Sequence, residues 1–335
     1  MPTFLVADAV FRQHKPPGEH PERPERLVAI EQALAAAGLV GRCERLPVRP
    51  ATRQEVLRVH TQDHYHHLEQ LLRGGYGWLD PDTYYGPGSW EAALCAAGAA
   101  VDLALRLGQG SGNGLALLRP PGHHATRDRA MGFCLFNNIA IGAAAARAAG
   151  ARVAIVDFDV HHGNGTEEIF ASDPDVLFVS THQHPLYPGT GEAAFVGVGL
   201  GRGATVNIPL PQGSDDAVYR RCFERVVIPA LLRFAPDLIL VSAGFDGHRR
   251  DPLAGMALTE QGYADLTAML LGVQPRLGML LEGGYHLESL AASVVAVLEV
   301  LLGDRCLRPA RQVTGAELAP EAEAAIALAR RLHGL

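Results

Sequence analysis

The sequence predicts an α/β fold: a single-domain, doubly wound, mostly parallel sheet with helices on both faces. Two observations predict it. Short apolar runs rich in Val, Ile and Leu alternate with longer amphipathic segments, which is the pattern of buried parallel strands joined by helices. Polar clusters also follow directly after most of these runs, at the carboxyl edge of the expected sheet, where such sheets bind ligands. We therefore expect the functional site at that edge.

Seven runs are expected to form the strands of this sheet. Each is short enough for a strand, and too apolar to face water on either side. In chain order they span residues 3–10, 114–120, 152–159, 175–182, 205–210, 238–244 and 277–284.

Seven amphipathic segments are expected to form helices. Thr52 and Glu55 have the spacing of a capping box at the start of one of them. Gly38 and Gly108 follow two others, at the position where helices commonly end. The predicted helices span residues 24–37, 52–59, 89–107, 138–149, 215–234, 260–271 and 287–302.

The alternation of strands and helices indicates one large domain. No repeat of fixed period and no low-complexity linker interrupts it. Only the Ala- and Glu-rich end differs in composition. We expect a main domain over residues 1–310 and a helical tail over 311–335, packed on that domain or appended to it.

The composition excludes several classes of protein. The 29 basic residues include a single lysine, Lys15, which excludes a Walker-type phosphate loop and leaves almost no candidate for a Schiff base. A net charge of −7, with both signs interspersed, argues against a nucleic-acid partner. No stretch approaches the roughly 18 consecutive apolar residues of a membrane helix, and the N-terminus lacks the pattern of a secretion signal. We expect neither membrane insertion nor secretion.

The cysteines point to a reducing compartment. Their odd number, wide separation and lack of a Cys-x-x-Cys pair indicate neither a disulfide framework nor a thiolate zinc site. We therefore expect a cytoplasmic protein. The five are Cys43, Cys95, Cys134, Cys222 and Cys306.

Asp159, His161 and Asp246 are candidate metal ligands. Asp157, Asp159 and His161 alternate at the end of one predicted strand, so their side chains share a face. Alone, this pattern fits helix-capping carboxylates at least as well. Asp246 follows a second strand, and one imidazole with two carboxylates suits a zinc ion that keeps its fourth position open for water. We expect one catalytic zinc ion per chain.

His123 and His124 are candidates for proton transfer. They follow Pro120-Pro121-Gly122, a stiff turn, and the pKa of histidine lies nearest to working pH. Tyr285 follows two glycines that allow close backbone approach, so its phenol is a candidate donor to an oxyanion, although a buried core tyrosine is the plainer interpretation. The helical cluster of His60, His64, His66 and His67 is instead expected on a solvated face.

The polar clusters together resemble the motifs of a known family, the zinc-dependent histone deacetylases. The similarity is closest to the class II and bacterial deacetylase-like branch and covers most of residues 8–302, with the motifs in family order. The segments that carry it are RPPGHHA, GFCLFNN, DFDVHHGNGT, YPGTGE, SAGFD and EGGY. The resemblance implies an arginase/deacetylase-like fold and a deacetylase domain over residues 1–310.

The resemblance also implies roles for individual residues. Asp159, His161 and Asp246 are implied as zinc ligands, the pair His123 and His124 as the proton-transfer groups, and Tyr285 as the group that polarises the carbonyl. Asp157 is implied to orient His123. A structural monovalent cation, K⁺, is implied beside Asp157, Ser180 and Thr181, and a second beside Phe170, Asp173 and Val176.

Asn164 departs from one branch of the family. It stands where class I relatives have a carboxylate behind the second histidine. An amide stabilises an imidazolium less than a carboxylate does, so we expect His124 to have the lower pKa of the pair. Which histidine is the base and which the acid stays open, and the two are treated as one coupled unit.

The implied reaction is hydrolysis of an N-acyl amide by metal-activated water. By resemblance, Phe133 and Tyr187 wall a narrow slot for an acylated amine, and Gly132 allows close approach. Leu253 occupies a rim position where polyamine-selective relatives carry a glutamate, which slightly favours acyl-lysine of a peptide or protein over an acylated small amine. Glu19, Asp80 and Asp82 are further candidates for negative charge at the mouth, and they leave the second substrate class open.

Three alternatives remain at this point. One is an acetylpolyamine or other small-amide hydrolase with the same chemistry. The second is a non-catalytic, zinc-containing protein that binds acyl-lysine. The third is a dimanganese hydrolase of the arginase type, which needs more bridging carboxylates than Asp159 and Asp246 provide. Acyl-chain length and regulatory partners are left open, and a homo-oligomer is possible.

Overall fold

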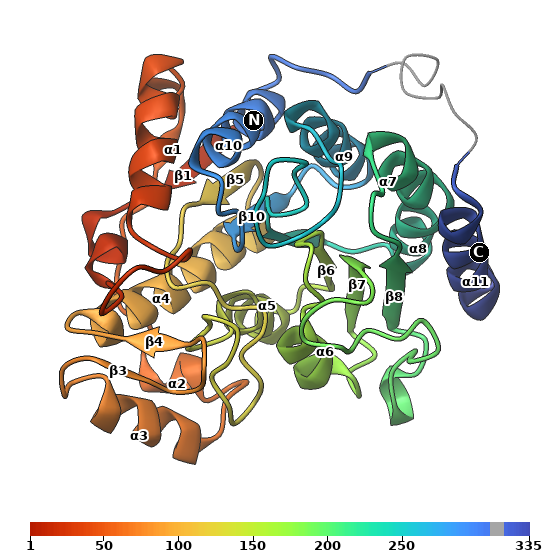
Figure 1. Cartoon of the computed structure of the whole chain (residues 1–335). Helices are drawn as coiled ribbons and strands as arrows, with labels where there is room; N and C mark the ends of the chain where they lie inside the picture. The colour runs from red at the N-terminus through yellow and green to blue at the C-terminus, as the bar shows by residue number, and fades with distance from the viewer. Residues whose placement is uncertain (309–317) are drawn as a thin grey trace.

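An eight-stranded sheet forms the centre of the protein. The computed structural model describes residues 1–308 and 318–335 (Figure 1). All strand pairings within the sheet are parallel, and the strand order is β2-β1-β5-β10-β9-β6-β7-β8. The predicted α/β class and doubly wound sheet are thus confirmed.

All seven predicted strands are present. β1 is shorter than predicted, because Asp8 caps a 3₁₀ helix over Ala9–Gln13 by accepting a hydrogen bond from Val10 N at 2.9 Å. The sequence missed β2 and the separate β3–β4 hairpin, whose two-residue strands are too short to show a period. The strands are β1 Thr3–Val6, β2 Glu44–Arg45, β3 Gly77–Trp78, β4 Tyr84–Tyr85, β5 Asn113–Ala116, β6 Val153–Asp157, β7 Val176–Gln183, β8 Thr205–Leu210, β9 Leu238–Ala243 and β10 Leu277–Leu281.

Helices cover both faces of the sheet (Figure 1). One face carries α4 (Ser89–Gln109), α5 (Asn138–Ala148) and α6 (Asn164–Phe170), with α2 (Arg53–Val56) packed outside α4 and α5 and α3 (Gln62–Leu71) beyond them. The other face carries α1 (Glu25–Ala36), α7 (Asp216–Cys222), α8 (Ile228–Phe234), α9 (Glu260–Val273) and α10 (Leu287–Leu301).

The predicted helix over 215–234 contains a wider turn. α7 and α8 are separated by one π-helical stretch over Phe223–Val227. Pro229 lies in the first turn of α8. Proline has no N–H, and its ring crowds the carbonyl group one turn before it, so a regular α-helical turn is disfavoured there.

The C-terminal helix α11 (Pro320–His333) packs against the edge strand β8. Arg225 pairs with Glu323, and Arg233 Nη1 donates to the carbonyl oxygen of His333 at 2.6 Å. The predicted tail is therefore helical over these residues, while the predicted domain boundary at 310 lies outside the described residues. Within residues 1–308 and 318–335, no helix has the length and apolar character needed to cross a membrane.

Candidate active site and metal centre

The loops after β5, β6, β9 and β10 meet at the carboxyl edge of the sheet. β10 and β9 lie between β5 and β6, so the strand order brings together segments that are far apart in the sequence. His123 and His124 follow β5, Asp159 and His161 follow β6, Asp246 follows β9, and Tyr285 follows β10. The polar clusters predicted to share one edge therefore do so.

Asp159, His161 and Asp246 form the metal-ligand cluster. Their candidate ligand atoms all lie within 4.8 Å of one another. Nδ1 of His161 is 3.2 Å from Asp159 Oδ1 and 3.1 Å from Asp246 Oδ2. Burial lowers the pKa of His161, but the two carboxylates outweigh it and raise that pKa to about 10. The cluster therefore concentrates negative charge around one imidazole nitrogen.

Two glycines make room for these carboxylates. A Cβ added at Gly244 would lie 1.9 Å from Asp159 Oδ2, and one added at Gly283 would lie 2.0 Å from Asp246 Oδ2. The backbone also fixes the ligands, since Gly283 N donates to Asp159 Oδ2 at 2.8 Å and Val160 N donates to Asp246 Oδ1 at 3.0 Å. Two oriented carboxylates and one imidazole fit zinc with a position left for another ligand.

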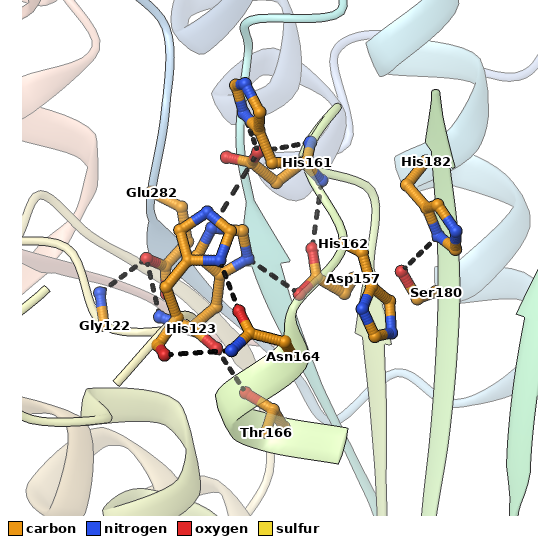
Figure 2. Close-up of polar contacts among 12 residues, drawn as sticks. Gly122, His123, Asp157, His161, His162, Asn164, Thr166, Ser180, His182 and Glu282 are labelled. Carbon is orange, nitrogen blue, oxygen red and sulfur yellow. Dashed lines mark hydrogen bonds and ion pairs between the residues drawn. The ribbon is translucent and has the colours of Figure 1, made fainter. Parts of the chain in front are cut away.

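His123 and His124 stand beside this cluster with their ring centroids 4.0 Å apart. Figure 2 shows the contact between His123 and Asp157. His123 Nδ1 lies 3.0 Å from Asp157 Oδ2, and its Nε2 lies 3.9 Å from Asp159 Oδ1. Burial lowers the pKa of His123, yet the carboxylates of Asp157 and Asp159 raise it to about 10. These two carboxylates therefore favour the imidazolium form of His123.

His124 has the opposite shift. Burial, followed by the neighbouring His123 and His161, lowers its pKa well below 6.5. Its Nδ1 lies 2.8 Å from Asn164 Oδ1, a contact that acts in the other direction. The expected lower pKa of His124 is present, but its main physical cause is burial beside two imidazoles, not the amide of Asn164.

A pocket of about 200 Å³ opens over the histidine pair and the metal-ligand cluster. Tyr285 is half-buried in its wall, where burial and then Asp246 raise the pKa of the phenol well above 10. All four predicted substrate residues line the pocket as well. The lining residues are Asp82, Pro121, His123, His124, Gly132, Phe133, His161, Leu186, Tyr187, Leu253, Gly283 and Tyr285.

Backbone geometry places the aromatic walls. Gly132 has a φ of +56°, and a Cβ there would lie 2.4 Å from Cδ2 of His124, so only glycine fits. Phe133 has a φ of +69°, which is uncommon for a residue with a side chain, and its N–H donates to Thr83 Oγ1 at 3.1 Å. The ring centroid of Tyr187 lies 5.1 Å from that of His124, and Tyr187 is 38% exposed.

The residues expected around monovalent cations also lie close together. Asp157 pairs with Ser180 in the β6–β7 register, and Thr181 Oγ1 donates to Asp157 O at 3.5 Å. In the second group, Asp173 N donates to Phe170 O at 2.9 Å, and Val176 begins β7. The carboxylate of Asp173 pairs with Arg147, with Nε to Oδ2 at 2.9 Å.

Three buried charged residues that the sequence analysis missed hold the site. Glu282 Oε2 accepts hydrogen bonds from Gly122 N at 2.6 Å and from His123 N at 3.2 Å (Figure 2). Arg26 donates to the carbonyl oxygens of Glu282 and Gly284, at 2.5 and 2.6 Å. Asp251 accepts from the backbone of the Tyr285 loop. The sequence feature that could have indicated such a residue is a charged residue directly beside an apolar run, as at Glu282.

The prediction of a solvated histidine face is wrong for His60 and His64, which are 3% and 4% exposed. Their rings lie 4.9 Å apart beside Phe136. His60 Nε2 accepts from Asn137 N at 2.9 Å, and His64 Nε2 lies 3.0 Å from Leu135 O. These partners are more than 70 residues away in sequence, so no local pattern shows them.

Comparison with known proteins places the chain in a family. Residues 20–301 match the family model of the histone deacetylase domain. The chain is 47% identical over 293 residues to histone deacetylase 15 of Arabidopsis thaliana, covering 85% of this chain and 53% of that protein, so it spans about half the length of this relative. It is 40% identical over 295 residues to the histone deacetylase-like amidohydrolase of Pseudomonas aeruginosa, covering 85% and 78%.

A solved structure agrees. The HDA15 HD domain superposes with a TM-score of 0.93 at 40% sequence identity, covering 99% of this chain and 94% of that one. The extent of these matches confirms that the motifs of the chain are those of this family. The chain belongs to the histone deacetylase family of hydrolases.

Proposed function

We propose that this chain hydrolyses N-acyl amides and removes acetyl or other short acyl groups from the amine of lysine side chains. One observation carries the proposal: His123, His124, His161 and Tyr285 line the same pocket, between the aromatic walls of Phe133 and Tyr187. Such a slot fits the unbranched stem of an acylated amine and places its acyl carbon among these polar groups.

His124 transfers the proton in the proposed reaction. A zinc ion at Asp159, His161 and Asp246 would supply a Lewis acid for the acyl carbonyl and lower the pKa of water. His124 is the proton acceptor: its Nδ1–H donates to Asn164 Oδ1 at 2.8 Å, and Nε2 keeps a lone pair for the proton of water. That proton then goes to the departing amine, which is too basic to leave as an anion.

His123 and Tyr285 act on the developing charge. The carboxylates of Asp157 and Asp159 favour protonated His123, which would place a positive charge beside the reacting carbonyl. The raised pKa of Tyr285 keeps the phenol protonated, and hence able to donate a hydrogen bond to the oxyanion. Asp157 orients His123 through the contact at Nδ1.

The slot supports acyl-lysine as the substrate, because Leu253 gives its rim an apolar residue that offers no partner to a distant ammonium group. A second candidate is an acetylpolyamine or similar small amine. It is favoured by Asp82, which also lines the pocket and would pair with such an ammonium group.

A substrate panel on zinc-loaded protein tests the proposal. We expect hydrolysis of an acetyl-lysine peptide, loss of activity with a chelator and recovery when zinc is returned. Side-by-side kinetics on N-acetylputrescine decide between the two substrate classes, and propionyl and butyryl peptides define the acyl length. No hydrolysis of any acylated amine by protein with one zinc per chain would falsify the proposal.

Tyr285→Phe separates catalysis from binding. Removing one oxyanion donor lowers kcat by about 10²- to 10³-fold, while the ring that lines the pocket is kept and KM changes little. A variant with undiminished turnover would exclude Tyr285 as the donor.

We further propose K⁺ as a structural cation beside Asp157, Ser180 and Thr181, with a second beside Phe170, Asp173 and Val176. Support comes from the backbone oxygens and hydroxyl groups gathered there. The five cysteines are free thiols, which supports a reducing cytoplasmic location. The deacetylase domain is proposed to span residues 1–310.

A further inference from the structure

Asp251 joins the two loops that carry Leu253 and Tyr285. It lies between β9 and α9, and the residue is only 7% exposed. Oδ1 accepts a hydrogen bond from Leu253 N at 3.0 Å. Oδ2 accepts from Tyr285 N at 2.7 Å and from His286 N at 3.3 Å. Three backbone donors from two loops thus end on one buried carboxylate.

Both of these loops form walls of the pocket. Leu253 and Tyr285 line it, although they are far apart in the sequence. Asp251 is itself fixed, since its N–H donates to His248 O at 2.8 Å. In the same loop, Arg26 Nε donates to Gly284 O at 2.6 Å. The carbonyl group before Tyr285 and the N–H of Tyr285 are therefore each held by a buried side chain.

The position of this backbone matters for the phenol. A tyrosine hydroxyl lies at the far end of a rigid ring, so a small rotation at the backbone moves the oxygen atom by a larger distance. A hydrogen-bond donor acts on an oxyanion only from about 2.7–3.1 Å. A displacement of about 1 Å lowers a rate on the order of 10²-fold.

We infer that Asp251 is a positioning residue for Tyr285: it fixes the phenol in the pocket wall and so sets the turnover rate more than the affinity for substrate. The inference rests on the proposed function, because it assigns the phenol its part in hydrolysis. Asp251 does not touch the substrate and acts through the backbone of Tyr285.

The test is Asp251→Ala, which removes both acceptor oxygens and so leaves all three backbone donors without their partner. We expect kcat to fall about 10- to 100-fold while KM stays within about threefold. In the Tyr285→Phe background the same substitution is expected to lower kcat by less than about threefold, because the hydroxyl that it positions is gone.

Asp265→Ala is the matched control. Asp265 is 2% exposed, and its carboxylate accepts from Arg308 N at 3.1 Å and from Arg308 Nε at 2.6 Å, away from the pocket. Both variants lose a buried, hydrogen-bonded carboxylate, but only Asp251→Ala is expected to change kcat at equal folded fraction. Equal losses of kcat in the two variants would show a general effect of instability and overturn the inference.

Hydrogen exchange gives a readout that does not need turnover. In Asp251→Ala the amides of Tyr285 and His286 are expected to exchange faster, while those of Gly122 and His123, held by Glu282, keep their rates. Unchanged exchange, unchanged kcat, or the full loss of kcat in the Tyr285→Phe background each contradicts the inference. If the parent chain hydrolyses no acylated amine, the proposed function fails, and the exchange rates alone decide whether Asp251 holds the loop.

Discussion

The carboxylate of Glu282 lies 3.2 Å from the backbone nitrogen of His123 and accepts its hydrogen bond. The same oxygen atom accepts from Gly122 N at 2.6 Å, so the end of β10 holds the loop that follows β5. Glu282 is 1% exposed, and burial is the main reason why its pKa rises from 4.5 to about 7. The histidine pair therefore depends on a carboxylate whose charge is unfavourable where it stands.

Glu282→Gln tests how much the buried charge of Glu282 destabilises the folded state as the pH rises. Because the pKa of Glu282 is higher in the folded state, its contribution to stability is fully present below pH 4.5 and is lost as the pH rises through 7. Between pH 4.5 and 7 the free energy of unfolding of the glutamine variant should therefore rise by roughly 3 kcal/mol relative to that of the parent. Urea unfolding across this range measures the change.

Glu55→Gln is the control for that titration. Arg49 lowers the pKa of Glu55 to about 2, so the stability that Glu55 contributes is lost only as the pH falls below 4.5. The difference in free energy of unfolding between Glu55→Gln and the parent should be constant between pH 5 and 7. If the difference for Glu282→Gln is constant over this range as well, the pKa of Glu282 is not raised in the folded state.

Gly283→Ala should abolish metal binding. The new Cβ would stand 2.0 Å from Asp246 Oδ2, so the carboxylate must move away from His161. We expect the zinc content, measured by mass spectrometry after dialysis, to fall far below one per chain. Gly272→Ala in α9, where nothing lies within 4 Å, should bind zinc as the parent does and be up to about 1 kcal/mol more stable. Full zinc content in Gly283→Ala would exclude this metal site.

Asn164→Asp should move the pH profile of hydrolysis. A carboxylate at 2.8 Å from Nδ1 of His124 favours the imidazolium and raises its pKa, typically by 1–3 units. As the base must be neutral, the acidic limb of kcat/KM should shift to higher pH. Asn164→Ala removes the contact without adding charge and should not shift the limb upward. If the acidic limb of kcat/KM stays at the same pH in Asn164→Asp, His124 is not the base.

Glu22→Ala should strongly destabilise the fold. Glu22 is fully buried and pairs with Arg119, at 2.5 and 2.8 Å, and with Arg26, at 3.1 Å. Its removal leaves two buried guanidinium groups without their carboxylate, which costs about 3–5 kcal/mol in the free energy of unfolding. Glu69→Ala, which breaks an exposed pair with Arg73, should cost less than about 1 kcal/mol. Chemical denaturation compares the two, and equal losses would contradict the prediction.

The sequence predicts a site residue well when the pattern that identifies it lies within a few neighbouring residues. Asp159 and His161 lie two residues apart on one strand end, and the apolar run before them is long enough to predict that strand. The same holds for His123 and His124 after their proline-rich turn. Asp246 is predicted as a metal ligand only because it is a carboxylate that follows a second predicted strand.

The sequence failed where a residue's role depends on distant partners. His64 has a polar neighbourhood in the sequence and is buried against Leu135, 71 residues away. Arg119 looks like an ordinary strand-end arginine, yet it is fully buried against Glu22. Asp251 occupies a turn-like segment, and its function depends on the backbone of Tyr285. Periodicity and spacing carry no information about such contacts.

The position of β10 also has a consequence for protein synthesis. This strand leaves the ribosome after every other strand of the sheet, yet it is inserted between β5 and β9, with Leu277 opposite both Asn113 and Ile239. A nascent chain that stops before Leu277 has its two sheet halves without the strand that joins them, and it lacks Tyr285. The candidate site can therefore assemble only after residues 277–285 have emerged, and until then the two halves of the sheet expose the strand edges that β10 later covers, which favours aggregation.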